Sequence, residues 1–341
     1  MKTVLNTSFE PTGSVHRTNP IASFFAILLF ASAAFGQVKS PIVGVSEKDV
    51  IGGSDTFFGI PLQRDAIYSG TIDSVTPDTS INCTTITPDG NPSWTADEFA
   101  FSAFVRITSG RAAGRIELIS ENQGFNLTVK TVFAPRVGDS FEIIPGWTLD
   151  SLFPPATQTT FHLSIGKLPA DRGSELLFYP ENGEGIETSP ISLAFLTSGG
   201  WTGLGDLYPR FGGVVLSPRS VFAIRHPDEA ADTKLPLFGN VDDSPRLIPI
   251  QILKGRANEN FTTPNRATST TLRRLGLKLG SRDRLLVFDD AEPDVFRFDG
   301  RSWLDETGAS ANNIVIEVGA ALAIRKAAGT ADKLTFWKQL P

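Results

Sequence analysis

One pattern of strands and turns occurs twice in this sequence, in residues 174–226 and again in residues 283–326. Each copy has an apolar strand, a turn followed by tryptophan, and a later strand that ends in Ala-Ile-Arg, at 223–225 and 323–325. Because side chains alternate between the two faces of a strand, we expect Ile224 and Ile324 to face a core, and the arginine after each to point outward. The repeat predicts two similar β units in the C-terminal half of the chain.

Short strand-like segments separated by turns extend along the rest of the chain. Residues 115–119 and 125–130 alternate apolar and polar side chains. The 31 glycines and 23 prolines are spread among these segments, which is typical of the turns in sandwiches and barrels. No segment keeps a helical period over three turns. We therefore predict an all-β fold of sandwich or barrel-like β domains, with tandem similar β units and very little helix.

A proline-rich stretch indicates where the chain divides. Residues 153–160 contain the pair Pro154-Pro155 followed by a polar run, a composition that favours an exposed and stiff connection. This predicts an N-terminal β domain at 37–153 and a C-terminal β domain at 158–341 that contains both similar units, 174–226 and 283–326.

The N-terminal segment has the pattern of an export signal. Basic side chains precede an apolar run from Ile21 to Phe35, and this run has the length of a signal-peptide core and falls short of a membrane span. Small residues follow, so we predict a signal peptide at 1–36 with cleavage after Gly36; cleavage after Ala33 is the alternative. The mature chain is then exported, to the periplasm, the cell surface or the medium, and holds no transmembrane segment.

Charge and cysteine content exclude several classes. The chain has a formal net charge of −6, which argues against nucleic acid as a partner because that needs a basic face. Cys83 is the single cysteine, so an exported chain has no internal disulfide. A lipid-bearing cysteine would directly follow the apolar run, and Cys83 lies far beyond it. We therefore interpret Cys83 as a small strand residue.

Three tryptophans beside turns are the candidate ligand-binding residues. Trp147, Trp201 and Trp303 each follow a glycine or serine turn, and an exposed indole at such a place can stack on a sugar ring. The alternative is structural, because a large aromatic side chain beside a turn commonly closes a core. Solvent exposure of these side chains distinguishes the two interpretations.

One acidic loop is the candidate metal site. Asp289, Asp290, Glu292 and Asp294 place four carboxylates within six residues, and oxygen ligands of this kind suit Ca²⁺. The spacing differs from that of an EF-hand, and a solvated acidic loop is the alternative interpretation. We predict no required cofactor, with Ca²⁺ as the one candidate ion.

Catalytic groups are sparse. After removal of the signal peptide, His162 and His226 are the remaining histidines, and no Gly-x-Ser-x-Gly elbow is present to supply a serine nucleophile. A glycosidase needs two carboxylates at a set separation, which the sequence alone does not place. We therefore predict that the protein is not an enzyme.

A local basic cluster contrasts with the acidic chain. It comprises Arg266, Arg273, Arg274, Lys278, Arg282 and Arg284. Such a cluster can contact an acidic cell-surface polymer or anionic lipid; a charged solvent-exposed face is the alternative.

Two resemblances support the fold and export predictions. Residues 107–116, with Ser109-Gly110-Arg111-Ala112-Ala113-Gly114, and residues 138–144 resemble a β-module of phage fibre-like and bacterial surface proteins. With Trp147-Thr148-Leu149, the two tryptophan copies and the terminal 337–341, the mature chain resembles an uncharacterised family of exported, β-rich bacterial proteins. These resemblances imply β structure and surface display, and no catalytic residues.

The sequence thus predicts an exported, non-enzymatic β protein with a structural, adhesive or surface-associated role. The expected partner is a cell-surface polymer or glycan. Two alternatives stay open: a carbohydrate-binding module that uses the three tryptophans, and an extracellular hydrolase.

Overall fold

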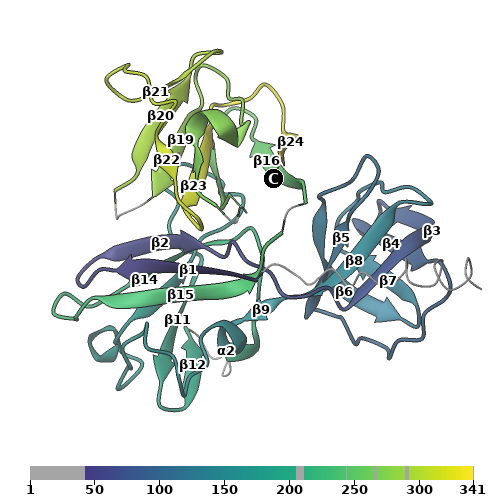
Figure 1. The fold of residues 1–341 in the computed structure, drawn as a ribbon, viewed down its shortest axis with the longest axis horizontal. Coiled ribbons are helices and arrows are strands. Elements are labelled where there is room, and N and C mark those ends of the chain that lie inside the picture. The colour runs from purple at the N-terminus through teal and green to yellow at the C-terminus, as the bar shows by residue number, and fades with distance from the viewer. Residues whose placement is uncertain are drawn as a thin grey trace, which may run out of the picture. The chain divides into compact units, whose positions relative to one another are not determined.

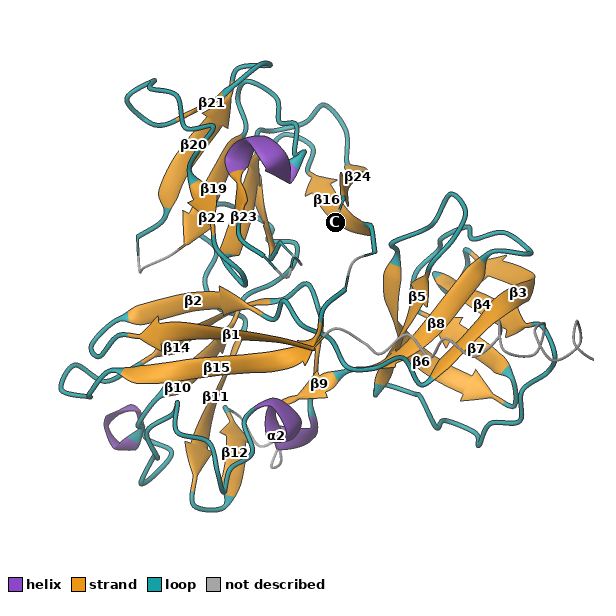
Figure 2. Ribbon diagram, in the orientation of Figure 1, coloured by secondary structure: helices purple, strands orange, loops and turns teal. Residues whose placement is uncertain are grey.

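The structure is a computed structural model that describes residues 43–204, 211–242, 244–264, 266, 268–288 and 292–340. The signal peptide predicted at 1–36 lies outside these residues. Strands dominate the described chain and helices are confined to short turns (Figure 2), so the predicted all-β fold is confirmed. No helix in the described residues has the length and hydropathy to cross a bilayer.

Six strands close into a barrel (Figure 1). Each pairs with its neighbours in antiparallel fashion in the order β3-β4-β7-β6-β5-β8, and β3 closes the ring by pairing with both β4 and β8. Alternate side chains fill the interior, where Ile119, Leu127 and Phe141 are fully buried. The barrel strands are β3 Tyr68–Asp78, β4 Cys83–Pro88, β5 Ala103–Ile107, β6 Ile116–Gln123, β7 Asn126–Val129 and β8 Ser140–Pro145.

A first sheet module flanks the barrel in sequence. Its five-stranded sheet has the order β12-β11-β10-β14-β2, and two-stranded pairs join β1 to β15 and β9 to β13. Its helical turns are α2 Leu149–Leu152, η1 Pro169–Asp171 and η2 Phe211–Gly213. Its strands are β1 Val43–Val50, β2 Asp55–Gly59, β9 Trp147–Thr148, β10 Glu175–Phe178, β11 Ser192–Thr197, β12 Gly200–Gly203, β13 Val215–Leu216, β14 Val221–Arg225 and β15 Thr233–Asn240.

A second sheet module follows. Its five-stranded sheet has the order β21-β20-β19-β23-β17, and β16–β24 and β18–β22 form two-stranded pairs. One helical turn, η3 Leu272–Leu275, follows β18. Its strands are β16 Arg246–Ile252, β17 Asn258–Thr262, β18 Thr270–Thr271, β19 Arg284–Phe288, β20 Asp294–Phe298, β21 Trp303–Leu304, β22 Val315–Ile316, β23 Ala321–Lys326 and β24 Lys333–Gln339.

The two sheet modules share one pairing scheme. When the strands of each module are numbered in chain order, the sixth, fifth, fourth, eighth and second form the main sheet, the first pairs with the ninth, and the third pairs with the seventh. The barrel enters the first module between its second strand, β2, and its third, β9.

Strand pairing in the first module crosses the boundary that the sequence analysis places between residues 153 and 158. β1 pairs with β15 in register from Val43–Asn240 to Val50–Thr233, and β2 pairs with β14. The strands before the barrel therefore belong to the same sheets as strands long after it. The domain limits 37–153 and 158–341 stay a prediction.

Alternation along the main sheets gives each of them two buried faces. Phe222 and Ile224 face the core of the first module, and Leu322 and Ile324 face that of the second. Between the two sheets lies a further apolar cluster, which includes Val221 and Ala223 from β14 and their counterparts on β23.

Aromatic rings form the centre of that shared cluster. Phe57 stacks on Phe288 with ring centroids 4.5 Å apart, and Tyr179 packs on Phe261 at 5.1 Å. Phe57 and Phe261 occupy the same position in the pairing scheme, each opposite the alanine of Ala-Ile-Arg. The two sheets thus meet through matching residues.

Candidate functional site: an arginine-lined groove

Two of the three candidate tryptophans lie in cores. Trp201 is 3% exposed and Trp303 is 2% exposed, in the cores of the first and second modules respectively. The Trp201 indole donates to the carbonyl of Phe153 at 3.1 Å. Neither ring offers a free face to a ligand, so their burial supports the structural interpretation.

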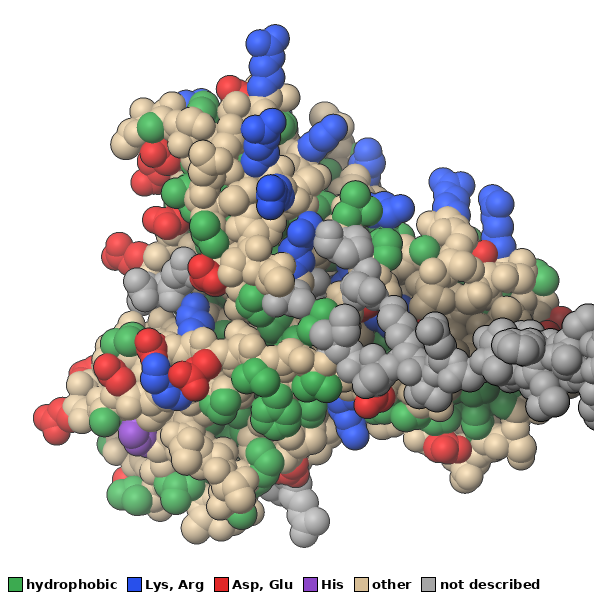
Figure 3. Space-filling view, in the orientation of Figure 1, with side chains coloured by type: hydrophobic (Ala, Val, Ile, Leu, Met, Phe, Trp, Pro, Cys, Tyr) green, Lys and Arg blue, Asp and Glu red, His purple; other side chains and the backbone are tan. Residues whose placement is uncertain are grey.

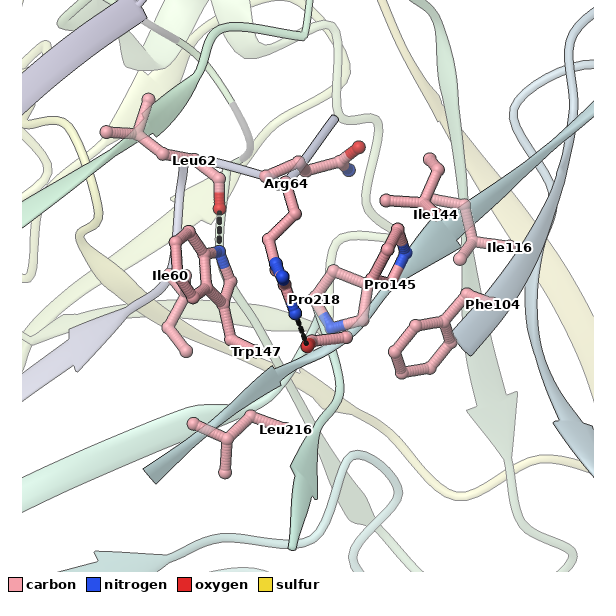
Figure 4. A pocket seen from close by; sticks show the side chains of 12 residues that line it. Ile60, Leu62, Arg64, Phe104, Ile116, Ile144, Pro145, Trp147, Leu216 and Pro218 are labelled. Atoms are coloured by element: carbon pink, nitrogen blue, oxygen red, sulfur yellow. Dashed lines mark hydrogen bonds between the residues drawn. The ribbon is translucent and has the colours of Figure 1, made fainter. Parts of the chain in front are cut away.

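Trp147 is half-buried beside a small apolar cavity (Figure 4). Its indole nitrogen donates to the Leu62 carbonyl at 3.0 Å, and the Arg64 guanidinium lies 5.8 Å from its ring centre. Ile144 and Phe104 of the barrel line the opposite wall. The cavity holds about 20 Å³, which is room for a single water molecule and no sugar.

The candidate calcium loop is described only in part. Asp289 and Asp290 lie outside the described residues, and Glu292 and Asp294 are exposed. In the part of the chain that the structure describes, no three His, Cys, Asp or Glu side chains gather as a metal site.

A serine–histidine contact that the sequence did not predict is buried. The Ser174 hydroxyl lies 2.7 Å from His226 Nδ1, and Thr233 Oγ1 lies 2.9 Å from Nε2. Because the Thr233 hydroxyl donates to the Thr160 carbonyl, it accepts from Nε2–H, and Nδ1 accepts from Ser174. Ser174 is 0% exposed, so its hydroxyl is closed to substrate and the pair is structural.

His226 has a strongly shifted pKa. Burial is the main cause, the neighbouring His162 adds to it, and Asp232 opposes it, so the pKa falls from 6.5 to about 4. The His162 ring lies 4.7 Å away, and its Nε2 is 3.0 Å from the Ala231 carbonyl. His226 is therefore neutral near pH 7 and packs in a closed environment.

An open groove of mixed polarity lies between two barrel loops and the β16–β24 ribbon. Its volume is about 460 Å³, within the range of small-molecule sites. We call it the arginine groove. It is lined by Arg111, Ala112, Arg115, Val132, Phe133, Ala134, Pro135, Arg136, Leu247, Leu334 and Phe336.

Glycines and one aspartate fix the two barrel loops of the arginine groove. Gly110 and Gly114 have φ values of +71° and +91°, a conformation that side chains other than glycine rarely adopt. A Cβ on Gly110 would lie 2.0 Å from Asp139 Oδ1. Asp139 in turn accepts from the Arg136 backbone N–H at 2.8 Å. The motif at 109–114 thereby holds Arg111 and Arg136 on adjoining loops.

Arg115 links the barrel to the β16–β24 ribbon, because its guanidinium lies between two aromatic rings. The Arg115 guanidinium lies 5.5 Å from the Phe133 ring centre and 4.8 Å from that of Phe336 in β24. It also forms a buried ion pair with Glu117. In addition, the Leu247 N–H donates to the Gly114 carbonyl at 3.0 Å. One wall of the arginine groove is therefore anchored to the other.

Free positive charge remains in the arginine groove. Arg111 and Arg136 are exposed, and within the described residues neither guanidinium forms a hydrogen bond or ion pair. Leu334 is 50% exposed, Phe336 and Val132 are each 42% exposed, and the described lining residues include no carboxylate. The groove thus offers unpaired guanidinium donors beside an exposed apolar wall.

The basic cluster predicted from the sequence lies in the second sheet module. Arg273, Arg274, Lys278 and Arg282 are exposed and form no ion pair with the carboxylates that the structure describes. Arg266 donates to the Leu340 carbonyl at 2.7 Å, and Arg284 to that of Asp283 at 2.8 Å. Figure 3 shows Lys and Arg side chains gathered over this module.

The sequence shows the motif at 109–114 but does not predict that it forms part of a groove. Arg111, Arg136 and Phe336 are far apart in the chain, and only the loop packing and the β16–β24 pairing bring them together. No protein-family model, curated protein or solved structure matches this chain. The resemblance to exported β-rich proteins stays a prediction.

Proposed function

We propose that the protein is an exported, non-enzymatic β protein with a structural, adhesive or surface-associated role, and that it holds its partner in the arginine groove. The observation that carries the proposal is the pairing of exposed, uncompensated Arg111 and Arg136 with the apolar wall of Leu334 and Phe336. Guanidinium groups bind carboxylate, sulfate and phosphate in a forked geometry, and these groups are common on cell-surface polymers.

The burial of Ser174 beside His226 supports the non-enzymatic part of the proposal. A serine nucleophile needs access to substrate, and Ser174 has none. Cys83, the single cysteine, is likewise buried. Turnover of a glycoside or ester by the folded chain, lost on His226→Gln, would contradict this part.

Export is supported by the apolar run at 21–35 and the small residues that follow it. The test is fractionation of the expressing cells, followed by N-terminal sequencing of the protein outside the cytoplasm. We expect a mature chain that begins at Gln37. A chain that stays in the cytoplasm with its N-terminal segment intact would contradict export.

Binding at the surface is tested by co-sedimentation of the folded chain with purified envelopes of the expressing cells. We expect retention that falls at high salt, because exposed charges are screened, and that falls in the double variant Arg111→Gln/Arg136→Gln. Arg301→Gln is the control, since it removes one exposed arginine that lies outside both the groove and the basic cluster. Equal retention of all variants would contradict the proposed site.

A carbohydrate-binding role is the second candidate, and it rests on Trp147, the one candidate tryptophan that is not buried. Polysaccharide retention that Trp147→Ala abolishes, and that Arg111→Gln/Arg136→Gln leaves intact, would favour it over the arginine groove.

We further propose that the two sheet modules are copies of one β unit, the first of which received the barrel as an insertion. Their common pairing scheme supports this. So do matching ion pairs, Arg225 with Asp55 and Arg325 with Glu259, each across the outer strand pair. A contact between matching faces is the arrangement of a symmetric dimer, here built within one chain.

A further inference from the structure

We infer that the arginine groove takes a small amphipathic anion, in which a carboxylate, sulfate or phosphate is joined to an aliphatic or aromatic body. This inference rests on the proposed function, and it names the chemistry of the ligand. Both halves of that chemistry are argued from the groove lining.

The anionic half follows from the two free guanidinium groups. Arg111 and Arg136 lie on adjoining loops joined by Asp139, so their positions are set before a ligand arrives. Asp139 is itself only 8% exposed and accepts from the backbone N–H of Arg136. Arg115 already has Glu117 as its counter-ion. A ligand anion can therefore pair with Arg111 and Arg136, and a cationic ligand would be repelled.

The apolar half follows from the β16–β24 ribbon. Alternation sends Ile248 and Trp337 into the core of the second module, and it turns Leu247, Leu334 and Phe336 toward the groove. Val132 adds to this wall from the barrel side. Removing exposed apolar surface of this kind from water is favourable. A ligand body of aliphatic or aromatic carbon would cover this wall.

The size of the arginine groove limits the ligand. A volume of about 460 Å³ suits a molecule of drug-like size, and the floor is closed by Arg115 between Phe133 and Phe336. An inorganic anion alone leaves the apolar wall wet, and an uncharged alkane leaves the arginines unpaired. The two features together select a molecule that carries both groups.

The test is isothermal titration calorimetry on the exported chain with a matched series of probes. Decanoate and 2-naphthoate carry both features, one with an aliphatic body and one with an aromatic body; acetate has the anion alone, decanol has the chain alone, and decylammonium has the opposite charge. We expect decanoate, 2-naphthoate or both to bind more tightly than the other three probes. The preference between the two bodies identifies the kind of ligand.

Variants and chain length sharpen the test. Lengthening octanoate to decanoate should raise affinity by about fourfold per buried methylene. Arg111→Gln/Arg136→Gln should lower it by about tenfold or more, Phe336→Ser should reduce the gain per methylene, and Arg301→Gln should leave both unchanged. Circular dichroism and the urea midpoint confirm that each variant is folded.

Three results would overturn the inference: decylammonium binding as tightly as decanoate, decanoate binding unchanged in the double arginine variant, or no binding of either decanoate or 2-naphthoate. Arginine-dependent retention on cell envelopes would then still support the proposed function, because that assay does not depend on a small ligand.

Discussion

Acidification should destabilise the folded chain through one buried histidine, His226. This side chain is 2% exposed and neutral near pH 7, and it accepts from Ser174 at Nδ1 while it donates to Thr233 from Nε2. A proton on Nδ1 would face a serine oxygen that already accepts from the His162 backbone N–H at 2.8 Å. The His162 ring packs against the His226 ring and lowers its pKa, and the charge of Asp232 opposes that effect.

The sign and size of this loss of stability follow from the pKa of His226, which is about 4 in the folded chain and 6.5 for an ordinary histidine. Above pH 6.5 both states are neutral and the stability is full. As the pH falls from 6.5 to 4, the unfolded chain takes up the proton first, so the free energy of unfolding falls. The difference of about 2.5 pKa units corresponds to a loss of about 3 kcal/mol at the acid end of this window.

The assay is urea unfolding at several pH values between 7.5 and 4, followed by tryptophan fluorescence, to which the buried Trp201 and Trp303 contribute. The matched variant is His226→Gln, which keeps an amide donor and acceptor but does not titrate. We expect it to lose about 3 kcal/mol less than the unsubstituted chain over this range. His162→Gln should reduce the loss partly, since it removes a neighbouring positive charge. The same pH dependence in His226→Gln as in the unsubstituted chain would show that His226 does not cause the loss of stability.

Three further substitutions test the packing, each measured by urea unfolding. Asp242→Asn should cost about 3 kcal/mol, because it removes the carboxylate that the buried Arg246 shares with the partly buried Arg106; a cost below about 1 kcal/mol would contradict this. Phe288→Ala should cost about 3–5 kcal/mol by removing a ring that is 7% exposed and stacked on Phe57. Gly59→Ala should destabilise strongly, because its Cβ would lie 2.2 Å from that of Thr263, and Thr263→Gly should restore stability only in that background.

Local patterns predicted much of the fold. The alternation in Ala-Ile-Arg placed Ile224 and Ile324 in cores, where both are 0% exposed, and the density of turns predicted the all-β class. These features depend on neighbouring residues alone, so one sequence suffices to find them.

Local patterns could not predict which distant strands pair with one another. Nothing near β1 in the sequence indicates that Val43 pairs with Asn240 across an intervening barrel. The tryptophans failed as a guide to the site for a similar reason, because a turn beside Trp201 looks the same whether the ring points to solvent or to Phe161. The arginine groove is built from four separate segments of the chain, and the net negative charge of the whole chain gives no sign of this local positive charge.

The most direct test of the arginine groove is a crystal structure of the exported protein with decanoate brominated at its far end. We expect carboxylate density within hydrogen-bonding distance of Arg111 or Arg136, and an anomalous bromine peak against Leu334 and Phe336. A bromine peak at another place in the molecule, with the groove empty, would contradict this expectation.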